Sequence, residues 1–587
     1  MNVADYVVSK LVESGIRDVF VLPGGGSMYL VDALARCTAI RSIAMLHEQG
    51  AAIAAEAYAQ ARDGLGVVVV TTGPGGTNAM TGVASAWLDS VPLLVISGQV
   101  KTTDLAGDSG LRQRGFQEIN VVEMVRPIAK FAMTVLTPQS ACEKIQIALD
   151  ETRSKRPGPV WLDIPLNVQS ANVPRQLPTK KLAHDSEPAS FDAKQLIHDL
   201  RIAQRPLVLL GNGVRLSGAI PEVTALMNVL QVPYQVSWKA LDLIPFDHKL
   251  FAGRPGGIAT RYANFAQQSA DLFIAIGARM DYGQTAYNPD GVAPRAKRYF
   301  VDIDARELEK LISINTETIA EDAKKFLQIL LGALGNETIR APERWTQRIL
   351  EWKERYSLSS EGVFNEFLGT YDVVEMLSNH MCAEDVLVPG SSGACSEVTM
   401  QAFKNKIGQR VLNSQGLGAM GFGVPAAIGV AIAFSDRDVY SVDGDGGFVM
   451  NIQELEVAKR LELPICWIVL DNGGYGSIVS TQNSYFSGRK LASDTESGLT
   501  LPSIVDAAKA FGLRSELVST KAQLEVALSS FRSTRMPTVI VAKVSSQHRT
   551  IPRVTSRTVN GSISSDPMED MSPKLPEEVL RSELFFD

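Results

Sequence analysis

The chain has 587 residues, and its hydrophobic content of 45% and charged content of 21% are ordinary for a globular protein. The formal net charge of −7 and the lack of a Lys/Arg-rich run argue against nucleic acid as the main partner. No apolar stretch reaches the roughly 18 residues of a membrane span, and the five scattered cysteines form no CxxC pair. We therefore expect a cytoplasmic protein with reduced thiols and no membrane partner.

Alternating strand-like and helical runs divide the chain into three α/β blocks. Their expected bounds are 1–175, 190–340 and 365–550, and residues 551–587, rich in Ser, Pro and acidic side chains, are expected to form a C-terminal tail or lid. In chain order, the clearest strand-like runs are 18–22, 67–72, 93–97, 206–210, 272–276, 299–303, 439–442 and 465–470. This alternation predicts an α/β fold with three doubly wound parallel sheets.

The third block carries polar residues where two neighbouring strands end. Asp445 stands in a Gly-Asp-Gly turn after one apolar run, and Asn472 follows the next apolar run, with a helical stretch expected between them. The carboxyl ends of parallel strands meet at one edge of a sheet, where open α/β sheets bind ligands. Asp445 and Asn472 offer oxygen ligands to a divalent cation such as Mg²⁺. The backbone N–H groups of Gly446 and Gly447 can approach an anion at a helix N-terminus.

Segments in all three blocks resemble the acetolactate-synthase-type family of thiamine-diphosphate-dependent enzymes, over roughly residues 1–550. The Gly-Asp-Gly turn and its distant Asn resemble the family's cofactor fingerprint, and residues 413–431 resemble its diphosphate-binding domain. Residues 46–100 resemble its pyrimidine-binding domain, and residues 211–219 with 276–305 resemble its central domain, which in several members holds FAD. The resemblance implies thiamine pyrimidine-binding, central nucleotide/FAD-binding and thiamine diphosphate/Mg-binding domains in that order, with thiamine diphosphate, Mg²⁺ and FAD as cofactors.

Within the resemblance, Glu48 and Gln117 are the candidate catalytic residues. The family's glutamate at the position of Glu48 bonds N1′ of the aminopyrimidine and promotes the imino tautomer that deprotonates the thiazolium C2. A carboxyl group beside an Ala-rich helix would be partly desolvated, which suits proton sharing with a ring nitrogen; the alternative is an ordinary first-turn glutamate. Gln117 lies in a Phe-Gln-Glu segment whose Gln approaches the reacting centre in the family. Arg126 and Lys130 also match family positions, although long cationic side chains are usually only solvated.

The resemblance further implies three sets of binding residues. The thiamine diphosphate set is Gly418, Met420, Ser391, Ser392, Gly446 and Gly447. The Mg²⁺ set is Asp445, Asn472 and the backbone carbonyl of Gly474. The FAD set is Gly211, Gly213, Arg215, Arg279, Asp302 and Asp304. Alternatives remain open, because Met420 suits a core gap, the two serines suit an ordinary loop, and a GxG after a strand is weak evidence by itself.

Two departures from acetolactate synthases concern the acceptor. Those enzymes usually continue GxRxDDR, where the last Arg grips the carboxylate of the second 2-ketoacid; here Gly283 takes that place. They also carry a Trp shortly after the metal Asn, whereas Thr481 stands at about that position and no Trp follows Asn472. Losing a charged hydrogen bond weakens a carboxylate ligand by roughly 1.5–3 kcal/mol. An acceptor without a carboxylate is the simplest inference.

The departures, together with residues 23–34, 390–397 and 568–580, resemble yersiniose-type flavoenzymes of polysaccharide biosynthesis. Those enzymes decarboxylate pyruvate and add the two-carbon acetaldehyde unit to a CDP-4-keto-3,6-dideoxyhexose. The resemblance implies a transferase or carboligase that takes pyruvate and a keto-sugar nucleotide and makes a branched-chain sugar. Because Glu48 and Asp445 lie in different domains, the family's site forms between subunits, which implies a homodimer or homotetramer. The alternatives are an acetolactate synthase, a simple decarboxylase, and a non-catalytic flavin-binding homologue.

Overall fold

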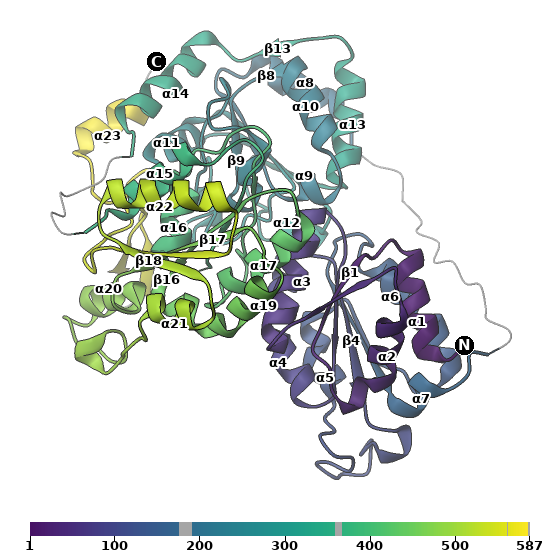
Figure 1. Cartoon of the computed structure of the whole chain (residues 1–587). Helices are drawn as coiled ribbons and strands as arrows, with labels where there is room; N and C mark the ends of the chain where they lie inside the picture. Colours follow the sequence, from purple (N-terminus) through teal and green to yellow (C-terminus); the bar gives the residue numbers. More distant parts are fainter. Residues whose placement is uncertain (175–190, 359–366, 392, 560–561, 585–587) are drawn as a thin grey trace. The chain divides into compact units, whose positions relative to one another are not determined.

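The computed structural model describes residues 1–174, 191–358, 367–391, 393–559 and 562–584 (Figure 1). The chain divides into two compact units. The first unit comprises Met1–Asp185, Asp385–Ser396 and Arg410–Ser546, and the second comprises Ser186–Glu384, Glu397–Gln409 and Gln547–Asp587.

The N-terminal domain of the first unit is built on a six-stranded parallel sheet with the order β2-β1-β3-β4-β6-β5. Its strands are β1 (Asp18–Val21), β2 (Arg41–Ala44), β3 (Gly66–Val70), β4 (Leu93–Gln99), β5 (Phe131–Thr134) and β6 (Pro159–Pro165). Its helices are α1 (Val3–Glu13), η1 (Gly25–Ser27), α2 (Met28–Arg36), α3 (Glu48–Arg62), α4 (Pro74–Leu88), η2 (Thr102–Asp104), α5 (Val121–Val125), η3 (Arg126–Ile128), α6 (Pro138–Glu151) and α7 (Leu166–Ser170). Successive valines of β3 enter opposite apolar clusters, so helices cover both faces of the sheet.

The C-terminal domain of the same unit repeats this strand order, as β15-β14-β16-β17-β19-β18, and is also parallel throughout. Its strands are β14 (Val386–Pro389), β15 (Arg410–Val411), β16 (Val439–Gly444), β17 (Ile465–Asp471), β18 (Arg514–Val518) and β19 (Thr538–Lys543). The helices after β14 are α16 (Gly393–Ala402), α17 (Gly423–Ala433), α18 (Asp445–Phe448), η6 (Val449–Glu454), α19 (Leu455–Arg460), α20 (Gly476–Tyr485), η7 (Thr495–Ser497), α21 (Ile504–Ala510) and α22 (Lys521–Thr534). The single helical stretch expected after Asp445 is thus broken into three pieces, with a non-helical residue at Asn451.

Helices α3 and α17 join the two domains of this unit, and Figure 1 shows them side by side. Both are rich in Ala and Gly, and almost every residue of both is buried. Small side chains let two helices approach closely: a Cβ atom at Gly429 would collide with the backbone carbonyl of Ala54. One continuous apolar cluster consequently runs from the first sheet through α3 and α17 into the second.

The central domain lies in the second unit and contains a five-stranded parallel sheet with the order β12-β11-β10-β7-β9, beside a two-stranded sheet of β13 and β8. Its strands are β7 (Pro206–Leu210), β8 (Leu230–Gln231), β9 (Tyr234–Val236), β10 (Leu272–Ile276), β11 (Lys297–Asp302), β12 (Thr316–Ala320) and β13 (Ile339–Arg340). The helices of this unit up to α15 are α8 (Ala193–Ile202), α9 (Gly213–Leu216), α10 (Ile220–Val229), η4 (Trp238–Leu243), α11 (Arg261–Ser269), η5 (Pro289–Gly291), α12 (Ala305–Glu309), α13 (Ala323–Leu334), α14 (Glu343–Arg355) and α15 (Thr370–His380). The predicted fold class, three doubly wound parallel α/β domains, is confirmed.

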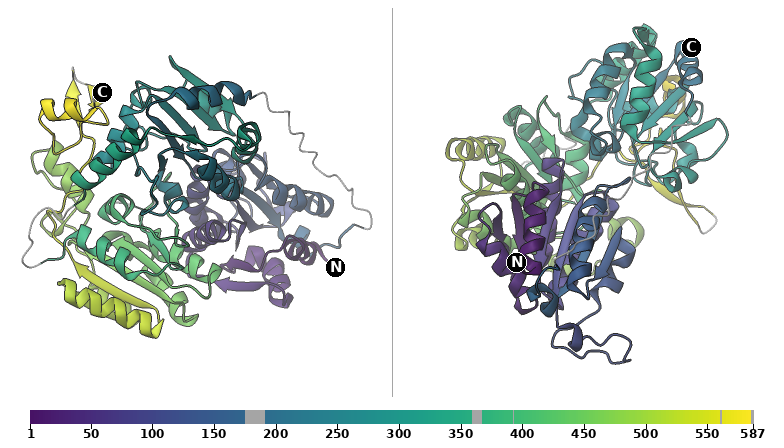
Figure 2. Two further views of the ribbon diagram at one scale, coloured as in Figure 1. Left: turned by 90° about the horizontal axis from the view of Figure 1, so that it is seen from above. Right: turned by 90° about the vertical axis from the view of Figure 1, so that its right-hand side faces the viewer.

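The C-terminal segment packs on the central domain. It forms an antiparallel hairpin, β20 (Ser556–Val559) with β21 (Ser562–Ser565), and a last helix, α23 (Glu577–Leu584). The Glu583 carboxylate, 2% exposed, accepts the Trp352 indole N–H at 2.7 Å and pairs with Arg348 at 2.7 Å. Figure 2 shows this yellow helix beside teal segments of the central domain. A role as a lid remains a prediction.

Among the residues that the structure describes, no helix has the length and apolar character needed to cross a bilayer.

Candidate active site

All three parallel sheets bring glycines into close contact at the point where the strand order reverses. In the first domain this point lies between β1 and β3, in the central domain between β7 and β10, and in the third between β14 and β16. A Cβ atom at Gly24, Gly211 or Gly390 would collide with the residue following the neighbouring strand or at its end. Such switch points form the crevice in which doubly wound folds bind ligands. The candidate residues gather at these crevices.

The three predicted Mg²⁺ ligands lie together at the carboxyl ends of β16 and β17. The carboxylate of Asp445 accepts the N–H groups of Gly473 and Gly474 at 2.8 and 3.0 Å, which ties it to the turn after β17. The side-chain oxygen of Asn472 lies 3.2 Å from the Gly474 nitrogen in the same turn. These hydrogen bonds hold the Asp445 carboxylate, after β16, against the turn after β17, which carries the Asn472 amide oxygen and Gly474.

The electrostatics of Asp445 suit a cation. Burial raises the pKa of Asp445 to about 6, and the nearby Asp471 carboxylate acts in the same direction, against the backbone N–H donors. Asp471 itself is paired with Lys543 at 3.0 Å. Burial disfavours the ionised form of a carboxyl group, whereas a bound divalent cation favours it. A cation at this site would therefore stabilise the Asp445 carboxylate.

The predicted cofactor cradle assembles around the same turn. Gly418 has a φ of +62°, and a Cβ atom there would lie 3.2 Å from the carbonyl oxygen of Ser391. A Cβ atom at Gly446 would lie 3.5 Å from the Met420 methyl group, so Met420 overhangs the Gly-Asp-Gly turn. Ser391 Oγ is buried and has no hydrogen-bond partner among the described residues, as expected of a donor reserved for a ligand oxygen. Ser392 lies outside the described residues.

Two further glycines of the predicted set keep their places beside β16. Gly446 donates its N–H to the Asp445 carboxylate at 2.7 Å, and Gly447 packs against the buried Asp443 side chain. Burial raises the pKa of Asp443 to about 7, with Asp445 adding to the effect. Asp443 was not among the predicted site residues, because a second carboxylate near the motif has no distinguishing spacing.

Glu48 is the first residue of α3 and is 6% exposed. Its carboxylate accepts the Asn78 side-chain amide at 3.0 Å, and its other oxygen lies 3.7 Å from where a Cβ atom would stand on Gly75 in the first turn of α4. The first-turn position expected of an ordinary glutamate is therefore observed, but the near-complete burial is not ordinary for a lone carboxylate. Burial among small residues is what proton sharing with a ring nitrogen requires.

Gln117, in the loop before α5, packs against the residue that precedes α4. Its backbone has a φ of +61°, a strained conformation for a residue other than glycine, and its carbonyl packs on Gly73. The following Glu118 fixes this loop by accepting the N–H groups of Arg114 and Gly115 at 2.9 and 3.2 Å. The two predicted catalytic residues thus both contact the N-terminal end of α4, Glu48 through Asn78 and Gln117 through the cap residue Gly73.

Arg126 and Lys130, the two cationic residues that match family positions, make contacts on the surface and at a helix end. Arg126 pairs with Glu123 on the exposed surface. The Lys130 ammonium group donates to the carbonyls of Glu151 and Ser154, both at 2.5 Å, after the last turn of α6. Lys130 therefore caps the end of a helix, where a cation is favoured.

The six predicted FAD residues line the carboxyl edge of the central sheet, after β7, β10 and β11. Gly213 donates its N–H to Gly277 at 3.0 Å across the switch point. Arg215 pairs with the buried Asp242 at 2.7 Å, and Arg279 pairs with Asp281 at 2.9 Å. The remaining residues of the set are Gly211, which donates its N–H to Ile276, and Asp302, which accepts the N–H of the helix cap Asp304. Binding of FAD at this edge stays a prediction.

The loop that follows β10 carries Gly283, at the position of the missing Arg, and contains an exposed aromatic pair. Tyr282 and Tyr287, 62% and 72% exposed, stack with ring centroids 5.6 Å apart and planes 12° from parallel. Gly283 between them is exposed, and its carbonyl accepts the N–H of Gly257 at 2.8 Å. Residues 280–288 include no Lys or Arg. The sequence does not predict the stacked pair, since the two tyrosines stand five positions apart, which is not a spacing that brings side chains together in a helix or strand.

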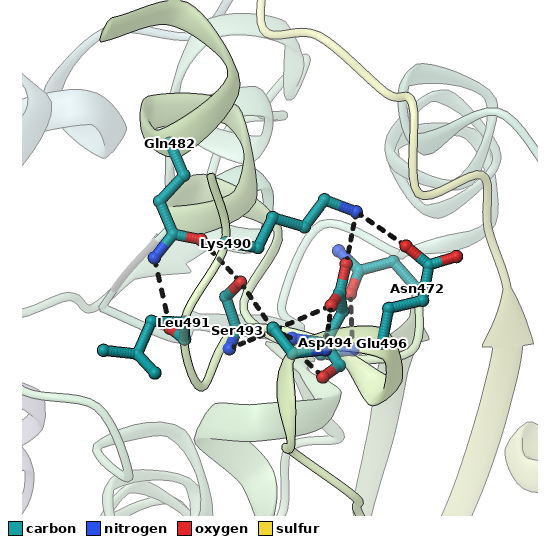
Figure 3. Close-up of polar contacts among 9 residues, drawn as sticks. Asn472, Gln482, Lys490, Leu491, Ser493, Asp494 and Glu496 are labelled. Carbon is teal, nitrogen blue, oxygen red and sulfur yellow. Dashed lines mark hydrogen bonds and ion pairs between the residues drawn. The ribbon is translucent and has the colours of Figure 1, made fainter. Parts of the chain in front are cut away.

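The segment after Asn472 forms a polar network instead of an aromatic wall (Figure 3). Lys490 bridges Asp494 and Glu496 at 2.6 and 3.4 Å. Ser493 donates to the side chain of Gln482 at 2.7 Å, which fastens α20 to this loop. Helix α20 buries none of its residues, including Thr481 at the position of the missing Trp.

Comparison with known proteins agrees with this architecture. Three family profiles match in order: Thiamine pyrophosphate enzyme, N-terminal TPP binding domain over residues 1–124, the central domain over 193–330, and the C-terminal TPP binding domain over 391–542. The chain belongs to the thiamine pyrophosphate enzyme family. The predicted enzyme class is confirmed: it is a thiamine-diphosphate-dependent enzyme of the carboligase type.

The curated relatives that the chain resembles are acetolactate synthases. The chain is 32% identical to the acetolactate synthase isozyme 3 large subunit of Escherichia coli over 559 residues, which cover 93% of this chain and 95% of that protein. It is 32% identical to the probable acetolactate synthase large subunit of Methanocaldococcus jannaschii, covering 88% of each chain. It is 31% identical to the chloroplastic acetolactate synthase 2 of Zea mays, covering 94% of this chain and 87% of that protein.

The residues present fit the cofactor that this family implies. The buried hydroxyl of Ser391, which has no hydrogen-bond partner within the described part of the chain, lies with Met420 and the buried Asp445 around one turn at a switch point. A phosphate group, a planar ring and a divalent ion are the chemical groups that such donors recognise.

Proposed function

We propose that the chain decarboxylates pyruvate and transfers the two-carbon acetaldehyde unit to the keto group of a nucleotide-activated 4-keto-deoxysugar, in branched-chain sugar biosynthesis. The proposal combines the enzyme class of the family with the acceptor departures seen in the sequence. It places the chain among carboligases that resemble acetolactate synthases but take an acceptor without a carboxylate, such as a CDP-4-keto-3,6-dideoxyhexose.

The observation that carries the acceptor proposal is the loop after β10. Gly283 stands where acetolactate synthases carry the Arg that grips a 2-ketoacid carboxylate, and the loop offers two exposed tyrosine rings instead. The nearest preceding cation, Arg279, is paired with Asp281. A loop whose nearest cation is already paired with a carboxylate favours a neutral acceptor, and exposed aromatic faces suit a ligand with sugar and base rings.

The site residues divide the work between the two domains of the first unit. Thiamine diphosphate, when bound, supplies an electron sink for decarboxylation and carboligation. Asp445, Asn472 and Gly474 would hold Mg²⁺ against the diphosphate, and the hydroxyl of Ser391 would donate to it. Glu48 would hold a proton at N1′ of the aminopyrimidine. Its buried carboxylate is suited to this because water cannot compete for the hydrogen bond.

The remaining binding residues extend the proposal. Gly418 and Met420 would hold the aminopyrimidine, Gln117 would orient the donor or acceptor, and the edge from Gly211 to Asp304 would bind FAD. A homodimer or homotetramer and a cytoplasmic location complete it; these stay predictions.

A second candidate is acetolactate synthase itself, with a further 2-ketoacid as acceptor. It is favoured by the curated relatives, which carry that name at 30 to 32% identity over most of the chain. The two candidates share every residue of the cofactor site, so only the acceptor separates them.

Mass spectrometry of products distinguishes them. The enzyme is incubated with pyruvate, Mg²⁺ and thiamine diphosphate, with and without a CDP-4-keto-3,6-dideoxyhexose. A sugar nucleotide heavier by one acetaldehyde unit, with little acetolactate, is expected. Acetolactate as the dominant product, with the sugar unchanged, would overturn the acceptor proposal.

Gly283→Arg sharpens the same test. Restoring the cation should raise acetolactate formation relative to sugar addition by roughly ten-fold or more, the size of one charged hydrogen bond. Gly332→Arg, on the exposed face of α13 with open space around it, is the matched control and should leave the product ratio unchanged.

A further inference from the structure

A buried carboxylate from the C-terminal domain holds the turn that leads to Glu48. Glu454, the last residue of η6 and 0% exposed, accepts the N–H of Leu46 at 3.2 Å. Its other oxygen packs on Gly50 in the first turns of α3, where a Cβ atom would collide with it. Glu454 thus contacts the chain on both sides of Glu48: at Leu46, two residues before α3 begins, and at Gly50, the third residue of α3.

A second carboxylate makes the reverse connection. Asp89, which ends α4 of the N-terminal domain, accepts the N–H groups of Gln415 and Gly416 at 2.9 and 2.8 Å. That loop continues to Gly418 and Met420. Each domain therefore provides one buried carboxylate that accepts backbone N–H groups from the other domain. In each case the hydrogen-bonded loop leads to a residue proposed to contact the cofactor.

We propose that Glu454 is a positioning residue for Glu48, setting the height and direction of the Glu48 carboxylate by holding the Leu46 turn and the first turns of α3. Among the described residues, the side-chain amide of Asn78 hydrogen bonds to the Glu48 carboxylate and fixes one of its oxygens. Its backbone is fixed by the start of the helix, and that start rests on Glu454. The inference rests on the proton role proposed for Glu48 and names the group that aims it.

The chemistry of Glu454 supports a hydrogen-bonding role. Burial raises the pKa of Glu454 to about 7, while the N–H groups of Leu46 and His47 and the side chain of Gln453 act against it. A carboxyl group of this kind is about half protonated at neutral pH, and Gln matches its neutral form in shape and charge. Ala removes the acceptor altogether.

The test measures exchange of the C2 proton of bound thiamine diphosphate for deuterium, by NMR after acid quench. This step reports the Glu48 role and needs neither pyruvate nor an acceptor. At saturating Mg²⁺ and cofactor, Glu454→Ala should slow exchange at least about ten-fold, the effect of one lost buried hydrogen bond on a reacting geometry. Glu454→Gln, whose amide oxygen still accepts from Leu46, should stay within about three-fold of the native enzyme.

A merely structural role predicts a different pattern. In that case Glu454→Ala would lower the melting temperature while exchange in the folded, saturated holoenzyme stayed native, and the proposal would fail. Pyruvate turnover adds a second readout: kcat should fall with the exchange rate while KM for pyruvate stays constant. Where Glu454→Ala does not fold, Glu454→Asp carries the test, since its shorter side chain cannot reach Leu46 and should slow exchange in the same way.

Two variants distinguish a failure of the positioning role of Glu454 from a failure of the proton role of Glu48. Glu48→Gln should abolish exchange; if it does not, the role of Glu48 is wrong. If Glu48→Gln abolishes exchange but Glu454→Ala leaves it native, only the positioning role is wrong. Glu525→Ala, the same change on the exposed face of α22 in the same domain, is the matched control and should leave exchange unchanged.

Discussion

The N-terminal and C-terminal domains of the first unit share one strand order but differ in chemistry at the edge of the sheet. β1, β3 and β4 of the first correspond to β14, β16 and β17 of the second, and each order reverses at the same place. After β16 and at the end of β17, the C-terminal domain places Asp445 and Asn472. At the matching points the N-terminal domain places Thr72 and Gln99, which hydrogen bond to each other at 2.7 Å.

This difference decides what each edge can bind. A carboxylate with an amide oxygen can hold a divalent cation, whereas a hydroxyl paired with an amide satisfies itself and offers no charge. The N-terminal domain instead contributes its carboxylate from the helix after β2, where Glu48 is buried among small residues. One topology therefore provides two equivalent strand-end edges, and the proposed site uses the residues of one for the diphosphate and those beside the other for the ring.

The largest expected effect comes from Glu48→Gln. The amide cannot take up the proton, so turnover should fall by about 10² to 10⁴, the usual contribution of general acid–base catalysis. Steady-state kinetics measures turnover, and calorimetric titration should show cofactor affinity within a few-fold of native. Native turnover would contradict the assignment of the N-terminal crevice to the ring.

Asp445→Ala should break the other crevice. Because a direct ligand costs more than the roughly 10–100-fold of an outer-shell partner, Mg²⁺-dependent thiamine diphosphate affinity should fall by at least about 100-fold. Thr72→Ala is the matched variant at the equivalent strand end and should change that affinity by less than about ten-fold. Equal losses in both variants would mean that the two edges are not divided in this way.

The contact between α3 and α17 can be tested with a methyl group. Gly429→Ala would push a Cβ atom into the Ala54 carbonyl, and such overpacking costs about 1–3 kcal/mol. The free energy of unfolding from urea titration should fall by that amount. Gly332→Ala, in α13 with open space around it, should instead be neutral or stabilising by up to about 1 kcal/mol.

The smallest effect concerns a buried carboxyl group beneath the N-terminal edge. Burial raises the pKa of Asp163 to about 6 from an ordinary 3.8, against donors from Ser97, Gln99 and Thr134. Because the folded-state pKa is the higher one, the carboxyl favours the native state below about pH 4, and this contribution is lost as the pH rises through about 6. Asp163→Asn should therefore gain stability relative to the native protein between pH 4.5 and 7.5, by roughly 1–3 kcal/mol.

Urea denaturation at the two pH values measures this difference. Asp108→Asn, in an exposed loop of the same domain, is the control. A stability difference that does not change with pH would show that Asp163 titrates normally in the folded protein.

Much of the architecture follows from local sequence patterns. The runs 206–210 and 272–276 match β7 and β10 residue for residue, because apolar runs bounded by Gly or polar residues have few alternatives to a buried parallel strand. The helix expected after Asp445 was less well predicted: its apolar spacing is helical, yet the backbone breaks at Asn451, whose side chain donates to the Gly421 carbonyl at 2.7 Å. A tertiary hydrogen bond overrode the local preference there.

Motif spacing and apolar periodicity are local properties of the chain, so they predict the order of the three domains and the residues at the strand ends; the enzyme class follows from the family resemblance of those motifs. Contacts between residues far apart in the chain are visible in the folded structure alone. Glu454 and Leu46, Asp89 and Gly416, and Tyr282 and Tyr287 are joined by folding, and no spacing in the chain announces these contacts. The physical reason is that a hydrogen bond or a stacked ring depends on distance in space, which the packing of α3 on α17 and the turns of the loops establish.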